Sequence, residues 1–499
     1  MNSMHRGFLD DCEKEQLQHS GEIQSYGALL ILSKHFELTH WSENFIEFTG
    51  FNPADLAQSI SNRSFLPALA AFPTQPGHRS ELLTGLDSKN GLFDLVITRG
   101  NDETLLIEFF RSINCGIEWK NPPDMSGSYD PRSIQTLREE LVVWIAEVTG
   151  FDRVMYYQFL SEGDGEVVAE VSKHDQGSYL GLRFPASDIP QIARQLYLKT
   201  PWRVINNAQA SSITLLGNER ADLTWSDLRS VSPVHAIYMQ NMGDQSSLSF
   251  PISAGQELDA LISCHSRQPH LLPLERLCAI REVVVQFNRL LRNVMTASRL
   301  KLVDELTYHS QQVLKAMRQH QDAQTQWQTL SQWLLNEFEA DAAVLCYSNQ
   351  HLYAGQTVEA SLIDQLDNWF SHKSEELVFY KNRMRDLISS DILTHYAGAA
   401  GLKVRTHDKQ GTRLFLLRFE QVEEVAWGGN PDKPDEFHDG IYGIAPRRSF
   451  GKWVEKRMGY SREWGNATRL KLLRLRDELQ KVTPEHLTPW LSAGDKPHG

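Results

Sequence analysis

Two segments near the middle of the chain hold the side chains best suited to binding chemistry. The first, RFPASDIPQIARQLYLKTPWR (183–203), places Asp188 just before a proline and a predicted helix start, and ends at Arg203. The second, DLRSVSPVHAIYMQNMGDQSSLSF (227–250), carries Arg229 and His235, and ALISCHS further on adds His265. Guanidinium groups bind carboxylates bidentately, and hydroxyl groups complete such a shell. Together the segments indicate a ligand that carries carboxylates.

Aromatic side chains accompany the acidic residue of the first segment. A single carboxylate, Asp188, among Tyr157, Phe184 and Tyr197 would suit a buried cation. Each residue alone has a plainer interpretation. Asp188 in SDIP is also typical of a helix N-cap. The histidines of the apolar stretches VHAIYM and LISCHS are also typical of hydrogen-bonded core residues. Only the combination favours a binding site.

The cysteines indicate neither disulfides nor a thiolate metal site. There are five of them, widely spaced and without a CxxC pair: Cys12, Cys115, Cys264, Cys278 and Cys346. This usage fits a reducing cytosol. Cys12 lies in a polar tail, where most thiols are inert and exposed, and its neighbours Asp10, Asp11 and Glu13 disfavour a thiolate. A thiol enzyme is therefore the weakest interpretation of this chain.

Composition excludes several other classes. The 499 residues include 50 Lys and Arg against 63 Asp and Glu, and the formal charge of −13 disfavours a broad surface for nucleic acid or anionic lipid. The N-terminus has no apolar signal region, and the longest apolar runs are far too short to cross a bilayer. We therefore expect a soluble, cytoplasmic protein with no nucleic-acid or membrane partner. The phosphate-loop, dinucleotide-fold, hydrolase and zinc-protease motifs are missing, which favours a sensor or adaptor.

Periodicity predicts an α/β (α+β) protein of three mixed domains. Short apolar runs between Gly21 and Ile113 predict a first sheet domain, and a helix stopped by Gly150 followed by four strands predicts a second. No Gly or Pro occurs between Pro273 and Gly355, so a long helix, or two with a minor break, should lead into a third domain. Near the end, the spacing of Leu472, Leu475, Leu479 and Val482 predicts a coiled-coil seam.

Five motifs in order resemble the photosensory core of bacterial phytochromes, which is built from PAS, GAF and PHY domains. They are PASDIP (185–190), LRSVSPVHAIYMQNMG (228–243), ISCH (262–265), WGG (427–429) and PRRSF (446–450). The resemblance implies antiparallel sheets, a figure-of-eight knot formed by the N-terminal tail, and a long helical spine. It divides the chain into a tail at 1–20, a PAS domain at 21–120, a GAF domain at 130–300, a PHY domain at 301–480 with a tongue at about 425–464, and a C-terminal helix and tail at 466–499.

The resemblance implies biliverdin as the chromophore, attached by a thioether to Cys12. Val234 precedes His235, where other phytochromes use a cysteine, and this favours biliverdin over more reduced bilins. Asp188 and His235 would lie near the pyrrole nitrogens, and His265 would bond the D-ring carbonyl. Arg203 and Arg229, assisted by Tyr197, would pair with one propionate. The full set of expected cofactor-binding residues is Cys12, Tyr157, Phe184, Asp188, Ile189, Pro190, Tyr197, Arg203, Arg229, His235, Ser247, Ser249 and His265.

The resemblance also implies how light would be converted into a signal. Z/E isomerisation of the D ring would switch the protein reversibly between red- and far-red-absorbing states. Asp188 would exchange Arg447 for Ser449 on the tongue, while Trp427 and Trp453 exchange places as the tongue refolds from a hairpin to a helix.

The output of such a sensor is not encoded in this chain. No catalytic motif follows the third domain, so we expect no enzyme activity of the sensory core, and a C-terminal effector domain or a separate response partner. The long helix favours a parallel homodimer. A GAF-type sensor of another planar anionic ligand, without photochromism, is the alternative function.

Overall fold

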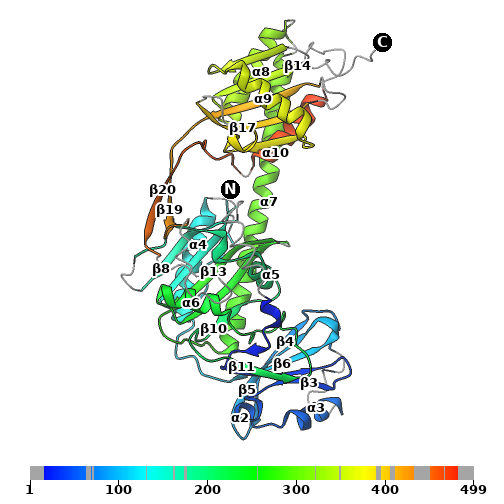
Figure 1. Cartoon of the computed structure of the whole chain (residues 1–499), viewed down its shortest axis with the longest axis vertical. Coiled ribbons are helices and arrows are strands. Elements are labelled where there is room, and N and C mark those ends of the chain that lie inside the picture. The colour runs from blue at the N-terminus through cyan, green and yellow to red at the C-terminus, as the bar shows by residue number, and fades with distance from the viewer. Residues whose placement is uncertain are drawn as a thin grey trace. The chain divides into compact units, whose positions relative to one another are not determined.

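The computed structural model resolves into two compact units. One consists of Met1–Val294 with Ala426–Trp453, and the other of Met295–Val425 with Val454–Gly499. The structure describes residues 16–62, 69, 72–127, 129–130, 132–160, 163–173, 177–255, 257–317, 319–320, 322–347, 350–388, 395–404, 411–431, 450–465 and 467–481. Cys12, Arg447, Ser449 and Val482 lie outside these residues. Figure 1 labels the elements.

The N-terminal domain of the first unit is built on a seven-stranded sheet. Its strand order is β1 (Glu22–Ile23), β11 (Ile213–Gly217), β3 (Leu38–Ser42), β2 (Gly27–Leu32), β6 (Leu105–Arg111), β5 (Gly91–Arg99) and β4 (Arg79–Ser88). The short helices α2 (Phe45–Thr49) and α3 (Pro53–Ser61) pack on one face. Asn52 caps α3 through its side chain, and Pro53 occupies the first turn, where a missing N–H costs nothing.

The other face of this sheet is covered by a segment from far along the chain. Ala221, Leu223 and Leu228 pack with Ile23 and Leu29 in one buried cluster. β11 belongs to the same segment and pairs antiparallel with both β1 and β3. The backbone N–H of Leu223 also donates to the carbonyl of Gln18, the middle residue of the one-turn helix η1 (Leu17–His19). The N-terminal segment is therefore held by the loop that joins two parts of the second domain. The tail before Gln16, where the expected knot begins, lies outside the described residues.

The second sheet has eight strands. Their order is β10 (Arg203–Ile205), β12 (Ser246–Ala254), β13 (Glu257–Ser266), β7 (Arg153–Phe159), β8 (Gly165–Ser172), β9 (Arg183–Phe184), β19 (Glu423–Gly428) and β20 (Lys452–Arg457). The described pairings are antiparallel, except that β19 meets β9 in parallel, Trp427 opposite Arg183. The short helices η3 (Asn101–Glu103) and η4 (Ala186–Asp188) lie in connections of the first unit.

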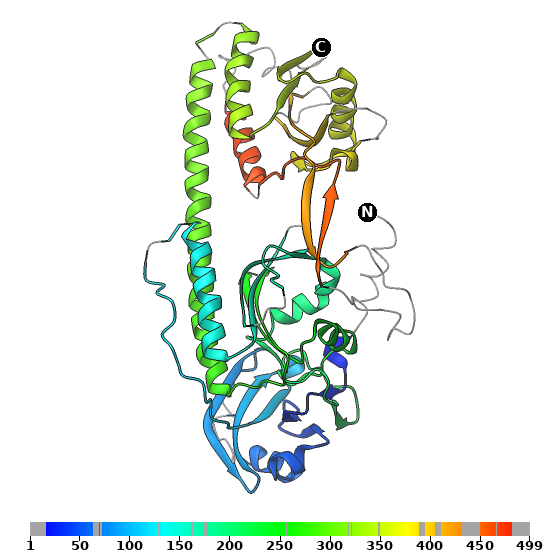
Figure 2. The ribbon, with the colours of Figure 1, turned by 90° about the vertical axis from the view of Figure 1, so that its left-hand side faces the viewer.

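Two long helices form a layer on one face of the second sheet. α4 (Ser133–Thr149) ends at Gly150, which adopts the left-handed conformation (φ 77°) that closes a helix without strain, as the sequence predicts. α7 (Leu274–Met317) is continuous for 44 residues, and Figure 2 shows α4 lying alongside it. Both helices contact Tyr156 of β7: Phe287 of α7 meets its ring edge-on and Arg138 of α4 lies over it. Successive strand residues face opposite ways, so Tyr157 points to the other face.

The second unit is a five-stranded antiparallel sheet between two apolar layers. The order is β15 (Gln350–Gly355), β14 (Ala342–Tyr347), β18 (Arg413–Phe419), β17 (Tyr396–Lys403) and β16 (Val378–Lys381). α8 (Ala323–Glu337) and α10 (Thr468–Gln480) contribute to the core on one face. α9 (Ala360–Asn368), η5 (Trp369–Lys373) and η6 (Met384–Asp386) contribute to the core on the other. The prediction of a long helix, or two with a minor break, is confirmed in its second form by α7 and α8.

The predicted coiled-coil seam is wrong for the residues that the structure describes. Leu472, Leu475 and Leu479 are at most 1% exposed and pack into the core of their own unit with Trp464 and Leu416. Their three- and four-residue spacing arises because one face of α10 is buried against the sheet of this unit. A helix that packs on a sheet and a helix in a coiled coil both need apolar residues at three- and four-residue intervals, so the pattern alone cannot separate them.

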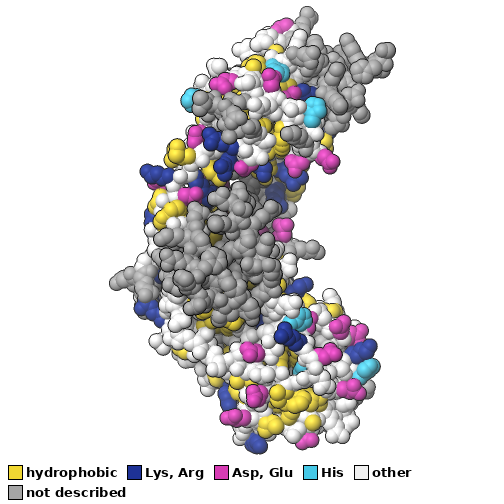
Figure 3. All heavy atoms as spheres, viewed as in Figure 1, with side chains coloured by type: hydrophobic (Ala, Val, Ile, Leu, Met, Phe, Trp, Pro, Cys, Tyr) yellow, Lys and Arg dark blue, Asp and Glu magenta, His cyan; other side chains and the backbone are white. Residues whose placement is uncertain are grey.

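The predicted fold class, mixed α/β domains with antiparallel sheets, is confirmed. Acidic and basic side chains are interspersed over the face of the N-terminal domain that Figure 3 shows. No helix among the described residues is long and apolar enough to cross a membrane.

Candidate functional site

The second sheet presents a row of polar residues on the face opposite α4 and α7. Its register sets Arg203 of β10 opposite Ser249 of β12, and Ser249 opposite Ser263 of β13. One step along, Ser247 lies opposite His265. Side chains two residues apart on a strand share a face, so these residues converge on one side. They line a single pocket together with residues of the helices that cover this face.

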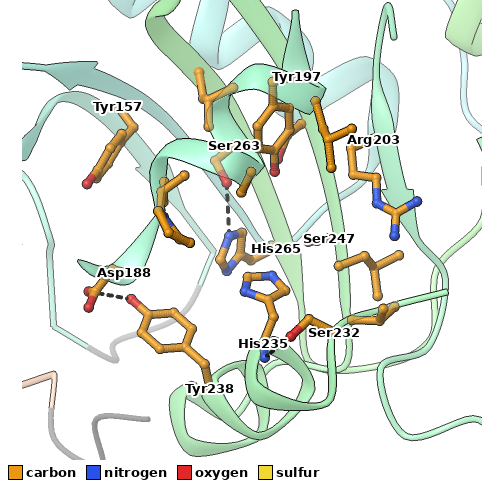
Figure 4. A pocket seen from close by; sticks show the side chains of 18 of the residues that line it. Tyr157, Asp188, Tyr197, Arg203, Ser232, His235, Tyr238, Ser247, Ser263 and His265 are labelled. Atoms are coloured by element: carbon orange, nitrogen blue, oxygen red, sulfur yellow. Dashed lines mark hydrogen bonds between the residues drawn. The ribbon is translucent and has the colours of Figure 1, made fainter. Parts of the chain in front are cut away.

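The covering helices are α5 (Gln191–Tyr197) and α6 (Pro233–Met242). Ser232 caps α6 by accepting a hydrogen bond from the His235 N–H, and Pro233 follows in the first turn. His235 and Tyr238 are three residues apart and therefore lie on the same face of α6, where their rings stack with centroids 5.9 Å apart. Figure 4 shows both side chains directed into the pocket.

One end of the pocket concentrates positive charge. Arg203 donates to the backbone carbonyls of Asp227 (3.3 Å) and Ser230 (2.9 Å), and Arg229 donates to those of Leu223 and Thr224. Burial lowers the pKa of Arg203, and burial together with the nearby Arg203 charge lowers that of Arg229 to about 9. Among the described residues, no carboxylate forms an ion pair with either guanidinium. Two buried cations in one pocket favour an anionic ligand.

Two histidines occupy the middle of the pocket, between Arg203 and Asp188 in Figure 4. Burial, His265 and Arg203 lower the pKa of His235 to about 4, so its ring is neutral at pH 7 and offers one donor and one acceptor. His265 lies with Nε2 3.0 Å from the Ser263 hydroxyl and Nδ1 2.8 Å from an Asp244 carboxylate oxygen. The two rings therefore have different surroundings.

Asp188 lies at the opposite end from the arginines. Its carboxylate accepts a hydrogen bond of 2.9 Å from the Tyr238 hydroxyl. The interpretation of Asp188 as a helix N-cap is wrong, because Pro190 holds that position in α5 and no side chain caps the helix. The one-turn helix η4 ends at Asp188, two residues earlier, and this leaves its carboxylate on the pocket wall.

Aromatic side chains close the pocket near Asp188. Tyr157 and Phe184 lie with centroids 6.0 Å apart, and Phe184 also meets Tyr179 edge-on. Phe450, the last residue of PRRSF, packs edge-on against Tyr238 with centroids 5.0 Å apart. Trp427, only 3% exposed, joins the sheet beside Phe184, and Trp453 is half-buried. Two segments of the predicted tongue, around Trp427 and Phe450, thus contact the second domain close to the pocket.

The structure brings the predicted binding residues together. Twelve of them line this one pocket: Tyr157, Phe184, Asp188, Ile189, Pro190, Tyr197, Arg203, Arg229, His235, Ser247, Ser249 and His265. The thirteenth, Cys12, and the tongue residues Arg447 and Ser449 lie outside the described residues. Leu17, five positions after Cys12, lines the pocket. No group of His, Cys, Asp and Glu suited to a metal ion occurs in the part of the chain that the structure describes.

Sequence reasoning missed Tyr238, Ser263 and Asp244. The spacing of Tyr238 from His235 and of Ser263 from His265 would have placed both on pocket-facing sides, once the helix and the strand were accepted. Asp244 follows Gly243, the left-handed residue that ends α6, and nothing in the local sequence points to its partner.

Comparisons with known proteins cover most of the chain. Three family models match: a PAS fold at residues 12–109, a GAF domain at 133–289 and a phytochrome region at 306–487. A bacteriophytochrome of Pseudomonas aeruginosa is 27% identical over 97% of this chain and 68% of its own length. Cyanobacterial phytochrome B of Nostoc is 28% identical over 91% of this chain and 64% of its own length. The chain thus spans about two thirds of these relatives.

Solved structures agree with this result. The photosensory core module of a Stigmatella aurantiaca phytochrome superposes with a TM-score of 0.77 at 25% identity, over 94% of this chain and 97% of that one. A bacteriophytochrome from R. palustris superposes with a TM-score of 0.74 at 23% identity, over 94% and 98%, which supports the fold.

Proposed function

This chain is a PAS–GAF–PHY photosensory core of the phytochrome family, and from that premise we propose that it is a red/far-red photoreceptor that binds biliverdin. The observation that carries the proposal is one pocket of the GAF domain, in which the predicted binding residues meet. It has two buried arginines at one end, a carboxylate and aromatic rings at the other, and two histidines between them. This charge pattern matches a long, planar ligand with two carboxylates and a cationic centre.

The arginine end would hold the propionates. Arg203 and Arg229 have only backbone carbonyls as described hydrogen-bond partners, so a carboxylate would supply the charge compensation that burial demands. Ser247 and Ser249, both less than 10% exposed, add hydroxyl donors from the neighbouring strand. Tyr197 lies on the same pocket wall. These residues would anchor and orient the chromophore.

The centre of the pocket would compensate the protonated pyrrole nitrogens. His235 is neutral at pH 7, so it adds no repulsive charge and its acceptor nitrogen is available. The Asp188 carboxylate supplies negative charge from the end of the pocket opposite the arginines. Tyr238 holds that carboxylate through a hydrogen bond of 2.9 Å. The chain thus offers a buried cation both a charge and an acceptor.

The aromatic end would house the ring that moves. Bound biliverdin would supply light absorption and Z/E isomerisation at its D ring. His265 and Ser263 offer polar contacts from the middle of the pocket, while Tyr157 and Phe184 form an apolar wall against which a ring could turn. Cys12 would form the thioether, and Leu17 already lines the pocket a few residues along the same tail.

The tongue would pass the change to the PHY domain. Phe450 packs on Tyr238, and Tyr238 in turn holds Asp188, so a rearrangement at Asp188 has a direct contact path to the tongue. The neighbouring places of β19 and β20 in the sheet order support a hairpin form of the tongue in this state. Arg447 and Ser449 are the proposed alternate partners of Asp188, and Trp427 and Trp453 the residues that exchange places. We further propose a parallel homodimer through α7 and an effector that follows the core or binds it.

A comparison of biliverdin with its dimethyl ester tests the charge matching. The ester has the same ring system but lacks both carboxylates. Each charge-assisted bond to a buried arginine contributes about 1.5–3 kcal/mol, so the ester should bind at least roughly tenfold more weakly. Affinity can be followed by quenching of tryptophan fluorescence and growth of the long-wavelength band. Equal affinities would refute the assignment of Arg203 and Arg229, and absence of biliverdin binding would favour a sensor of another planar anion.

A further inference from the structure

His265 has a carboxylate behind it that does not belong to the pocket wall. Asp244 Oδ2 lies 2.8 Å from His265 Nδ1, and Asp244 itself is not among the residues that line the pocket. The two side chains are 14% and 13% exposed. On the pocket side, the Ser263 hydroxyl lies 3.0 Å from His265 Nε2. The three groups form a continuous chain of hydrogen bonds, Ser263 to His265 to Asp244.

The fold fixes this arrangement from both directions. α6 stops at Gly243 in the left-handed conformation, and the Asp244 N–H then donates back to the Met239 carbonyl. Two residues later β12 begins, and its pairing with β13 places Ser246 opposite Ser266. The short link between helix and strand therefore holds Asp244 beside the end of β13, where His265 lies.

The chemistry of the partners sets the state of the ring. An ionised carboxylate can only accept hydrogen bonds. The Nδ1 atom of His265 must therefore carry a hydrogen and donate it in the hydrogen bond to Asp244. In the neutral ring Nε2 is then an acceptor, and the Ser263 hydroxyl is placed to donate to it. A carboxylate that accepts from one ring nitrogen, as Asp244 does here, fixes both the tautomer and the rotation of an imidazole.

We propose that Asp244 is a positioning residue for His265, which it holds in the Nδ1–H form with Nε2 turned into the pocket. Any effect of Asp244 on a bound chromophore rests on the proposed function, but the tautomer of His265 does not. Asp244 would act only through His265. In this neutral form Nε2 is an acceptor, so His265 would donate to the D-ring carbonyl only when Nε2 is protonated as well.

The ring state can be measured in the chain without any ligand. Imidazole ¹⁵N chemical shifts of a histidine-labelled sample distinguish Nδ1–H from Nε2–H, and a His265→Gln variant identifies the resonances. We expect the neutral ring of His265 to be Nδ1–H. In Asp244→Asn the amide can either accept or donate, so the tautomer ratio should shift by about tenfold or more. Glu257→Gln, which removes an equal charge from an exposed site on β13, should leave it unchanged.

A neutral Nε2–H ring in the unmodified chain would overturn the proposal, whatever the variants do. If Asp244→Asn fails to fold, this wild-type measurement still decides the matter. An unchanged tautomer ratio in a folded Asp244→Asn would also overturn it. These outcomes do not depend on biliverdin, so they are distinct from failure of the proposed photoreceptor function.

A double-mutant comparison tests the action through His265 in the biliverdin-loaded chain. Asp244→Asn should shift the dark absorption band and the extent of photoconversion, and it should add nothing to His265→Gln. Independent effects of the two substitutions would show that Asp244 acts by another route and would overturn the positioning role. Glu257→Gln should match the unmodified chain in both measurements.

Discussion

Replacement of Glu108 by glutamine should make the protein more stable at neutral pH. Glu108 lies on β6 and is fully buried, with one carboxylate oxygen accepting from the Ser226 hydroxyl (2.6 Å) and the Leu228 N–H (2.9 Å). No described residue bonds its other oxygen. Burial and the nearby Asp227 charge raise the pKa of Glu108 from 4.5 to about 7. The charged form is therefore the unfavourable one.

Proton linkage gives the sign and size of the change in the free energy of unfolding. Between pH 4.5 and about 7 the folded state retains a proton that the unfolded state has released, so this contribution to stability is complete below pH 4.5 and is lost as the pH rises through about 7. At about 1.4 kcal/mol for each pKa unit, the loss approaches about 3 kcal/mol at pH 8. Glutamine has the shape of the protonated acid and no charge, so Glu108→Gln should remove this loss.

The assay must report on the domain that holds Glu108, because a chain with several domains need not unfold in one step. Urea unfolding at pH 5 and pH 8, read by hydrogen exchange of the β6 amides, meets this need. We expect Glu108→Gln to be close to the unmodified chain at pH 5 and more stable by up to about 3 kcal/mol at pH 8.

Glu81 provides a control of opposite sign. Despite partial burial, its ion pairs with Arg79 and Arg281 lower the pKa of Glu81. Its stabilisation is therefore present above pH 4.5 and lost as the pH falls below that value, so Glu81→Gln should be destabilising at pH 8. If Glu108→Gln destabilised the β6 amides at pH 8 as Glu81→Gln does, the assignment of an unfavourable buried charge would be refuted.

Three further predictions concern the pocket. Cys12→Ala should bind biliverdin but lose covalent attachment, and a zinc-stained bilin band that persisted on a denaturing gel would identify another thiol. Asp188→Ala should impair photoconversion and raise fluorescence, whereas full photochromism of this variant would remove its central role. Gly165→Ala would place a methyl group against the Tyr157 ring, and displacement of a packed ring costs about 1–3 kcal/mol. Biliverdin affinity should therefore fall by roughly tenfold, and an unchanged titration would show that the ring is free to move.

Local sequence signals were sufficient for much of the fold. Gly150 marks the end of α4, and the absence of Gly and Pro after Pro273 marks α7, because these residues act directly on backbone conformation. The resemblance supplied most of the pocket, since its motifs carry the pocket residues in order. His235 and His265 are examples: their types and spacing alone fit core histidines equally well.

Partners that depend on strand register or on domain packing could not be predicted. Asp244 meets His265 only because β12 pairs with β13 in one register. Glu108 is buried only because the segment around Leu228 covers its sheet. The leucines of α10 have the expected apolar spacing, but they pack on the sheet of their own unit and not on a second helix of a coiled coil.

One absorbance measurement shows whether this chain is a red/far-red photoreceptor. The purified chain, mixed with biliverdin in darkness, should be recorded before illumination, after red light and again after far-red light. We expect two bands, in the red and the far-red, that exchange reversibly, and the dark spectrum identifies the resting state. A bound bilin whose spectrum is unchanged by either light would contradict the photoreceptor function and leave only a ligand pocket.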